Sequence, residues 1–177
     1  MARELLILRH AKSDWPEGVA DFNRPLKKRG KKAALRMGEW LLEQQLCPDW
    51  IVSSPAQRAS ETAEKLCKGM QLKKSRVLHF DDRIYESGLE ALKQVLADCP
   101  VFPRRLLLIG HNPGLEELLM DLVEGVETGP DGKLLATATL ARLQMPDDWS
   151  NLESHCGQLL SLTRAAALTA DNQENSD

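Results

Sequence analysis

Two histidines in this chain come directly after runs of apolar residues. His10 follows Arg9 at the end of the run Leu5–Leu8, and His111 stands two positions after the run Leu106–Ile109. Short apolar runs of this kind predict buried strands. In an open α/β sheet, ligands bind in the crevice beyond the carboxyl ends of the strands. Both imidazoles are therefore expected to border one crevice.

Two arginines are expected at the same crevice. Arg9 precedes the first histidine, and Arg58 stands in the first turn of a predicted helix that follows a third short strand, Trp50–Val52. Guanidinium groups bind phosphate oxygens in a bidentate way, and a neutral imidazole can act as a nucleophile. Two arginines and two histidines together indicate chemistry on a phosphoryl group.

The segments that carry these residues resemble a known family. Arg9-His10, Arg58 and Gly110-His111 are similar to the signature of the histidine phosphatase superfamily. Residues 8–13, 53–59, 85–86 and 110–114 most resemble its small branch of SixA-type phosphohistidine phosphatases, and the resemblance runs from about residue 3 to residue 163. It implies a phosphoglycerate mutase-like fold and an intermediate in which the phosphoryl group is carried on His10.

The resemblance also implies a role for each of these residues. His10 would attack phosphorus, Arg9 and Arg58 would bind the non-bridging oxygens, and His111 would add a further donor. Each motif alone also fits a structural role, such as a surface charge for Arg58. The four motifs occur together and in the family's order, which favours the phosphate site.

Four other residues are candidates for the site. Glu86, in a loop between a strand and a helix, is the candidate general acid, although an exposed loop glutamate fits it equally well. Asp21 and Arg24 match a segment that recurs in this branch, and they either contact substrate or form a salt bridge that pins their loop. Asn112, beside His111, is a candidate for substrate binding.

The leaving group and the chain length favour phosphohistidine as the substrate. An alkoxide needs a proton from the enzyme, whereas a phosphohistidine can take it on its own second ring nitrogen. Arg58 and Glu86 are 28 positions apart, and Glu86 and His111 are 25 apart, so no lid domain fits and the crevice should be open. The expected partner is a phosphorylated protein, such as a phosphotransfer domain. The alternatives are a phosphatase of small phosphomonoesters and, less favoured, a phosphate-binding module without turnover.

Composition limits the other classes of function. The 177 residues carry a net charge of −3, and the basic run Lys27–Lys32 is too short for a nucleic-acid footprint. No apolar stretch approaches the roughly 18 residues of a membrane span, and the N-terminal strand does not read as a removable signal peptide. We expect a cytoplasmic monomer that binds neither nucleic acid nor membrane.

No cofactor or metal is predicted. The four cysteines contain no CxxC pair, which argues against a zinc or redox site, and no carboxylate cluster is placed to hold a metal for hydrolysis. The cysteines, expected to be thiols, are Cys47, Cys67, Cys99 and Cys156.

Strand and helix patterns alternate along the chain. They predict an α/β three-layer sandwich with a mostly parallel sheet, helices on both faces and no lid insertion. The predicted helices cover residues 27–45, 55–68, 89–97 and 115–123, and the predicted strands cover residues 5–8, 50–53, 76–80, 105–109, 138–144 and 158–162. Pro55 is expected at the first position of its helix, Pro113 at the N-terminus of its helix, and Leu42 on an apolar face. One domain is expected over residues 1–164, followed by a disordered tail over residues 165–177.

Overall fold

The computed structural model describes residues 3–100 and 103–170. Its sheet has six strands in the order β3-β2-β4-β1-β5-β6. The strands are β1 (Arg3–Arg9), β2 (Trp50–Ser53), β3 (Leu78–Phe80), β4 (Arg105–Gly110), β5 (Thr139–Met145) and β6 (Gln158–Arg164). The neighbours β3, β2, β4 and β1 pair in parallel, and β5 is antiparallel to β1 and to β6. The prediction of a mostly parallel sheet is confirmed.

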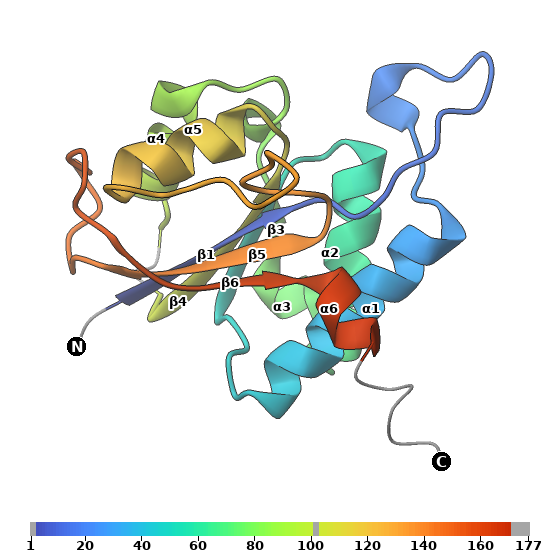
Figure 1. Cartoon of the computed structure of the whole chain (residues 1–177), viewed down its shortest axis with the longest axis horizontal. Coiled ribbons are helices and arrows are strands. Elements are labelled where there is room, and N and C mark those ends of the chain that lie inside the picture. The colour runs from blue at the N-terminus through green and yellow to red at the C-terminus, as the bar shows by residue number, and fades with distance from the viewer. Residues whose placement is uncertain (1–2, 101–102, 171–177) are drawn as a thin grey trace.

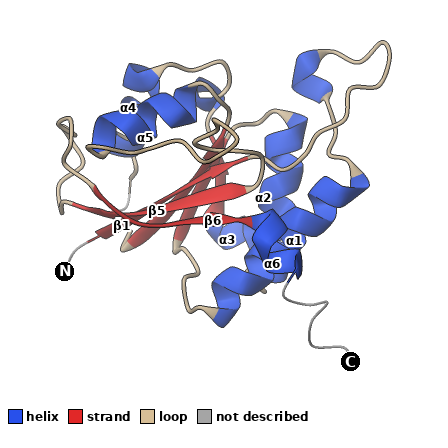
Figure 2. Ribbon diagram, in the orientation of Figure 1, coloured by secondary structure: helices blue, strands red, loops and turns tan. Residues whose placement is uncertain are grey.

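Helices cover both faces of this sheet, as Figures 1 and 2 show. The helices are α1 (Lys28–Glu43), α2 (Gln57–Gly69), α3 (Lys74–Val77), α4 (Leu89–Ala97), α5 (Gly114–Leu122) and α6 (Ala165–Ala170), with short 3₁₀ turns at Asp21–Asn23 and Asp82–Ile84. The layer of α1, α2 and α6 lies on one face, and α4 and α5 lie on the other. This is the predicted three-layer α/β arrangement.

The position of strand β1 between two layers of helices explains why its sequence is a continuous apolar run. Leu5 and Ile7 belong to the core shared with α4 and α5. Leu6 and Leu8 belong to the core shared with α1 and α2. A parallel strand covered on both faces buries every side chain, so its apolar residues do not alternate with polar ones.

Three local predictions were wrong. Helix α2 begins at Gln57 after the N-cap residue Ala56, so Pro55 lies just before the helix. Pro113, in contrast, lies at the N-terminus of its helix as predicted: it is the N-cap residue of α5, after a cis peptide bond to Asn112.

The strand predicted over residues 76–80 is only Leu78–Phe80. Residues 76 and 77 belong to helix α3, and the three residues that remain pair with Ile51–Ser53 of β2. Leu42, expected on an apolar face, is 39% exposed because α1 turns that side to solvent.

The C-terminal region corrects the expected domain boundary. Residues 165–170, predicted to be disordered, form helix α6. Ala165 and Leu168 are buried in the core that α1 and α2 share, and this packing stabilises the short helix. The rest of the predicted tail, residues 171–177, lies outside the described residues. Within the described ranges, no helix combines the length and apolar character needed to cross a membrane.

Candidate active site

The ends of three neighbouring strands bring the predicted residues together. Parallel pairing places Arg9 of β1 opposite Gly110 of β4, and Ser53 of β2 opposite Ile109 of β4. The next residues along these strands therefore meet at one edge of the sheet. The ring centroids of His10 and His111 are 5.2 Å apart there.

A cavity of about 230 Å³ opens at this edge. It is lined by six predicted residues, Arg9, His10, Arg24, Arg58, His111 and Asn112, and by Lys12, Ser13 and Thr137. Four of the nine carry a full positive charge, and none is Asp or Glu. A cavity with this lining suits an anion.

Three of these residues were not predicted from the sequence. Lys12 and Ser13 lie within a segment that carried the family resemblance, so their position just after His10 could have identified them. Thr137 comes from the long connection between α5 and β5, which holds no motif. Only the fold places Thr137 beside the strand ends.

The hydrogen bonding of His10 fixes its tautomer. His10 Nδ1 lies 2.8 Å from the carbonyl oxygen of Ala11. A carbonyl can only accept, so Nδ1 carries the proton and Nε2 keeps its lone pair. Burial is the main cause that lowers the pKa of His10 to about 3, so the ring is neutral near pH 7. A neutral imidazole with a free Nε2 lone pair is the form that a nucleophile requires.

His111 is also held as a neutral ring. Its Nε2 lies 2.8 Å from the hydroxyl oxygen of Ser54, which also accepts a hydrogen bond from the Ala56 backbone N–H. Burial is the largest cause that lowers the pKa of His111 to about 4, and Arg58 adds to it. Nδ1 of His111 is buried without a hydrogen-bond partner. His111 therefore lines the cavity as a neutral ring.

Each arginine is held by hydrogen bonds from its terminal nitrogens. Arg9 Nη1 donates to the carbonyl of Leu135 at 3.2 Å. The two terminal nitrogens of Arg58 donate to Asp21, at 2.7 Å to the backbone oxygen and 3.1 Å to Oδ2. The Nε atoms of Arg9 and Arg58 are buried without partners. Both side chains line the cavity, and guanidinium groups bind phosphoryl oxygens well.

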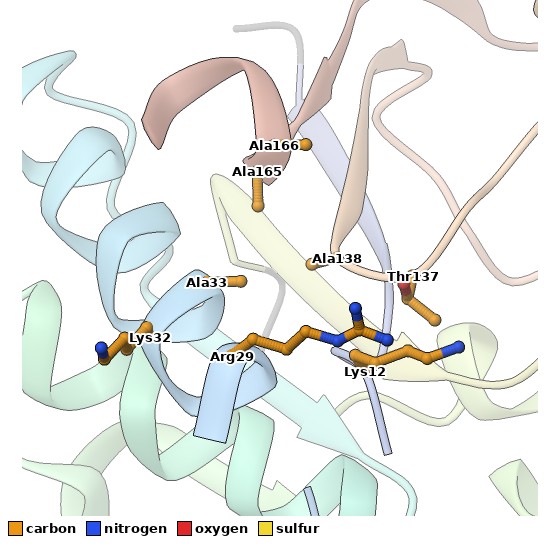
Figure 3. Close-up of a pocket in the computed structure, with 8 residues that line it drawn as sticks. All are labelled: Lys12, Arg29, Lys32, Ala33, Thr137, Ala138, Ala165 and Ala166. Carbon is orange, nitrogen blue, oxygen red and sulfur yellow. The ribbon is translucent and has the colours of Figure 1, made fainter. Parts of the chain in front are cut away.

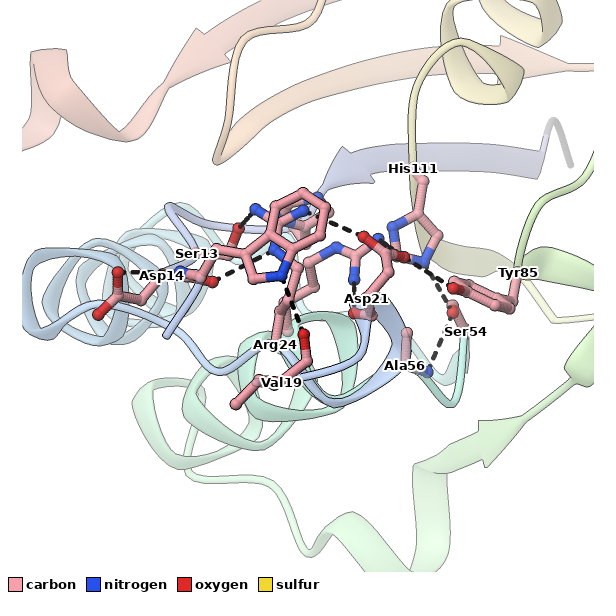
Figure 4. A network of polar contacts seen from close by, with 12 residues as sticks. Ser13, Asp14, Val19, Asp21, Arg24, Ser54, Ala56, Tyr85 and His111 are labelled. Atoms are coloured by element: carbon pink, nitrogen blue, oxygen red, sulfur yellow. Dashed lines mark hydrogen bonds and ion pairs between the residues drawn. The ribbon is translucent and has the colours of Figure 1, made fainter. Parts of the chain in front are cut away.

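Asp21 is the centre of a polar network that fixes Arg58 (Figure 4). Its carboxylate accepts from Arg58, from Arg24 at 3.2 Å and from the hydroxyl of Tyr85 at 2.7 Å. The Tyr85 hydrogen bond is the largest cause that lowers the pKa of Asp21 to about 2. Asp21 does not line the cavity. Of the two interpretations left open above, this geometry favours the salt bridge for Asp21, whereas Arg24 also reaches the cavity.

Asn112 helps to hold the Leu135 carbonyl to which Arg9 donates. Its Nδ2 donates to the carbonyl of Leu135 at 2.8 Å and to Glu116 Oε1 at 3.1 Å. The Leu135 backbone N–H donates to the same carboxylate oxygen at 2.9 Å. The loop carbonyl that orients Arg9 is thus held by the first turn of α5.

Glu86 lies outside the cavity. Its side chain is exposed, and its backbone has a φ of 54°. It lines a neighbouring hollow that His111 and Asn112 also border, together with Glu117. The structure brings Glu86 near the site without placing a carboxylate among the residues around His10.

Residues 3–100 and 103–170 hold no group of three or more His, Cys, Asp or Glu side chains that could bind a metal ion. In this part of the chain, the candidate site is built from arginine, histidine, lysine and neutral polar groups.

Comparisons with known proteins identify the family of this chain. Residues 5–96 match the model of the histidine phosphatase superfamily (branch 1). The chain is similar to a provisional phosphohistidine phosphatase SixA of Nakamurella multipartitia, with 25% identity, a TM-score of 0.77, and coverage of 93% of this chain and 96% of that one.

Two further proteins are similar over most of their length. A SixA protein histidine phosphatase solved with tungstate has 22% identity, a TM-score of 0.76, and coverage of 93% of this chain and 99% of that one. An uncharacterised protein of Mycobacterium tuberculosis is 27% identical over 158 residues, which are 86% of this chain and 96% of the relative. This chain belongs to the histidine phosphatase superfamily, and it is similar to SixA-type proteins.

Proposed function

We propose that this protein hydrolyses phosphohistidine on a partner protein through a covalent intermediate on His10, without a metal ion. The observation that carries the proposal is the hydrogen bond from His10 Nδ1–H to Ala11, which leaves the Nε2 lone pair free on a neutral ring. The cations of the cavity lining would bind the phosphoryl oxygens and stabilise the charge that spreads over them in the transition state.

The first step is an in-line displacement at phosphorus. The Nε2 lone pair of His10 forms a bond to phosphorus, and the bond from phosphorus to the substrate imidazole breaks. That imidazole leaves with the bonding electron pair, neutral if its other nitrogen already carries a proton. The Ala11 carbonyl accepts from His10 Nδ1–H throughout and stabilises the positive charge that develops on the ring.

The second step returns the enzyme to its starting state. A water oxygen forms a bond to phosphorus, and the electron pair of the phosphorus–nitrogen bond returns to His10 Nε2. The protons of the water go to a phosphate oxygen and to solvent, and inorganic phosphate leaves. His10 is again neutral with its proton on Nδ1.

The lining of the cavity favours phosphohistidine over an alkyl phosphate. An alkoxide leaving group needs a proton donor in the transition state. None of the described residues that line the cavity carries a carboxyl group, and the low pKa of His111 keeps it from acting as an imidazolium donor near pH 7. An imidazole leaving group does not require such a donor.

A substrate panel tests the proposal. Phosphoimidazole and a phosphohistidine peptide should show values of kcat/KM at least tenfold higher than glucose 6-phosphate, and EDTA should leave the values for the first two substrates unchanged. A preference for glucose 6-phosphate would contradict the substrate assignment. Loss of activity in EDTA, restored by a divalent cation, would contradict the metal-independent mechanism.

A further inference from the structure

A second cavity, of about 540 Å³, adjoins the phosphate cavity (Figure 3). It is lined by Lys12, Arg29, Lys32, Ala33, Thr137, Ala138, Ala165 and Ala166. Lys12 and Thr137 also line the phosphate cavity. The two cavities therefore share a wall, and a ligand that enters one can extend into the other.

The second cavity combines small side chains with unpaired positive charge. Four of its lining residues are alanines, and three are cations. Figure 3 shows the side chain of Arg29 extending toward Lys12. The ion pairs found in the described ranges use other cations, and none involves Lys12, Arg29 or Lys32. Their charges are available to an anionic ligand.

The positive charge of this cavity includes cations at the start of α1, where the helix dipole disfavours positive charge. Lys27–Lys32 contains five cations at the start of α1, and the first turn of that helix contains no acidic residue. Cations near a helix N-terminus are opposed by the helix dipole. Close packing nevertheless holds this end of α1 beside the site. Gly30 lies against the backbone of Lys12, and the Lys12 carbonyl accepts a hydrogen bond from the Lys27 N–H at 2.9 Å.

We propose that the second cavity is a docking subsite for acidic side chains that flank the phosphohistidine on the partner protein. This inference rests on the proposed function. The rim cations would attract an Asp or Glu carboxylate, and the small alanine side chains leave room for its aliphatic stem. The wall shared through Lys12 and Thr137 lets the phosphoryl group occupy the phosphate cavity at the same time.

The test compares two phosphohistidine peptides of equal length, one with Asp and Glu on both sides of the phosphorylated residue and one with Asn and Gln there. Phosphoimidazole serves as a substrate without flanks. The wild-type protein should have a kcat/KM about three- to tenfold higher on the acidic peptide. The preference should decrease as salt is added, because both partners are exposed to solvent.

Charge reversal in the cavity identifies the surface responsible. R29E and K32E should each reduce or abolish the preference for the acidic peptide, measured as the ratio of kcat/KM on the acidic peptide to kcat/KM on the neutral one. R29K should retain this preference. K73E is the matched control, since Lys73 is exposed and precedes α3, away from both cavities. The preference should persist in this control. A loss in K73E equal to that in R29E would overturn the proposal.

The outcomes separate this inference from the proposed function. Equal kcat/KM on the two peptides, with phosphoimidazole hydrolysed, would overturn the docking subsite alone. Failure to hydrolyse phosphoimidazole, with a phosphomonoester hydrolysed, would overturn the proposed function and the inference with it.

Discussion

The proton on His10 is placed by a contact within its own turn of chain. Nδ1–H donates to the carbonyl of the next residue, Ala11. The Ala11 backbone N–H in turn donates to Thr62 Oγ1 at 3.0 Å, and that hydroxyl donates to the Arg58 carbonyl at 2.7 Å. The turn that holds His10 and the backbone of Arg58 are therefore linked through one buried threonine hydroxyl.

Replacing Arg58 with lysine should lower kcat/KM by about 10² to 10³, the usual loss for one donor to a developing oxyanion. Lysine keeps the charge but loses the paired N–H groups, and it cannot make both of the bonds that Arg58 donates to Asp21. R76K, at an exposed arginine of α3, is the control. Steady-state kinetics on phosphoimidazole give the comparison. Full activity in R58K would reduce Arg58 to a structural charge.

Glu86→Gln should slow hydrolysis of an alkyl phosphate such as glucose 6-phosphate more than hydrolysis of phosphoimidazole. Only the oxygen leaving group depends on an enzyme proton. Glu117→Gln is the matched control, because Glu117 is exposed and lines the same neighbouring hollow. The measurement is the loss of kcat/KM from wild type to variant on each substrate, and the two losses are compared as a ratio. Equal losses on both substrates would mean that Glu86 acts on the phosphoryl group or on water, and no loss would leave it an exposed loop residue.

At the scale of elements, close approach of α1 to the loop after β1 shapes the site. A Cβ on Gly30 would lie 2.2 Å from the Lys12 carbonyl oxygen. Gly30→Ala should therefore push the helix from the loop, with an overpacking cost of about 1–3 kcal/mol and reduced activity. Urea unfolding measures the cost. Gly88→Ala is the control, since its Cβ would meet nothing within 4 Å, and equal stability losses in the two variants would contradict this packing.

The sequence predicted the elements whose signal is local. Strands β1 and β4 were found because each is an apolar run ending in a motif, and helix α4 was predicted over Leu89–Ala97 as observed. Helix α6 was missed because its stability comes from burial on α1 and not from its short, alanine-rich sequence.

Residues joined over long sequence distances were the hardest to assign. The bond between Arg58 and Asp21 joins positions 37 apart, and Thr137 reaches the cavity only through the fold. No local pattern encodes such contacts.

At the scale of the whole molecule, the buried histidines link stability to pH. Burial lowers the pKa of His10 to about 3 and of His111 to about 4 in the folded state, from about 6.5 in the unfolded chain. Below pH 6.5 the unfolded state binds protons that the folded state does not. The unfolding free energy should therefore fall by about 1 kcal/mol for each histidine between pH 7 and pH 5.5.

Chemical denaturation at several pH values tests this linkage. His10→Gln and His111→Gln should each flatten the dependence of the unfolding free energy on pH between 7 and 5.5. This comparison uses the slope, so a general destabilisation by either substitution does not affect it. Slopes equal to that of the wild-type protein would show that these two rings are not buried in neutral form.

The most direct test of the account is to locate the phosphoryl group during turnover. Phosphoimidazole is mixed with the protein, the reaction is quenched in alkali, where phosphohistidine persists, and the peptides are mapped by mass spectrometry. The account predicts a phosphoryl group on His10 in the wild-type protein, and neither label nor turnover in His10→Ala. A label on another residue, or hydrolysis that continues in His10→Ala, would contradict it.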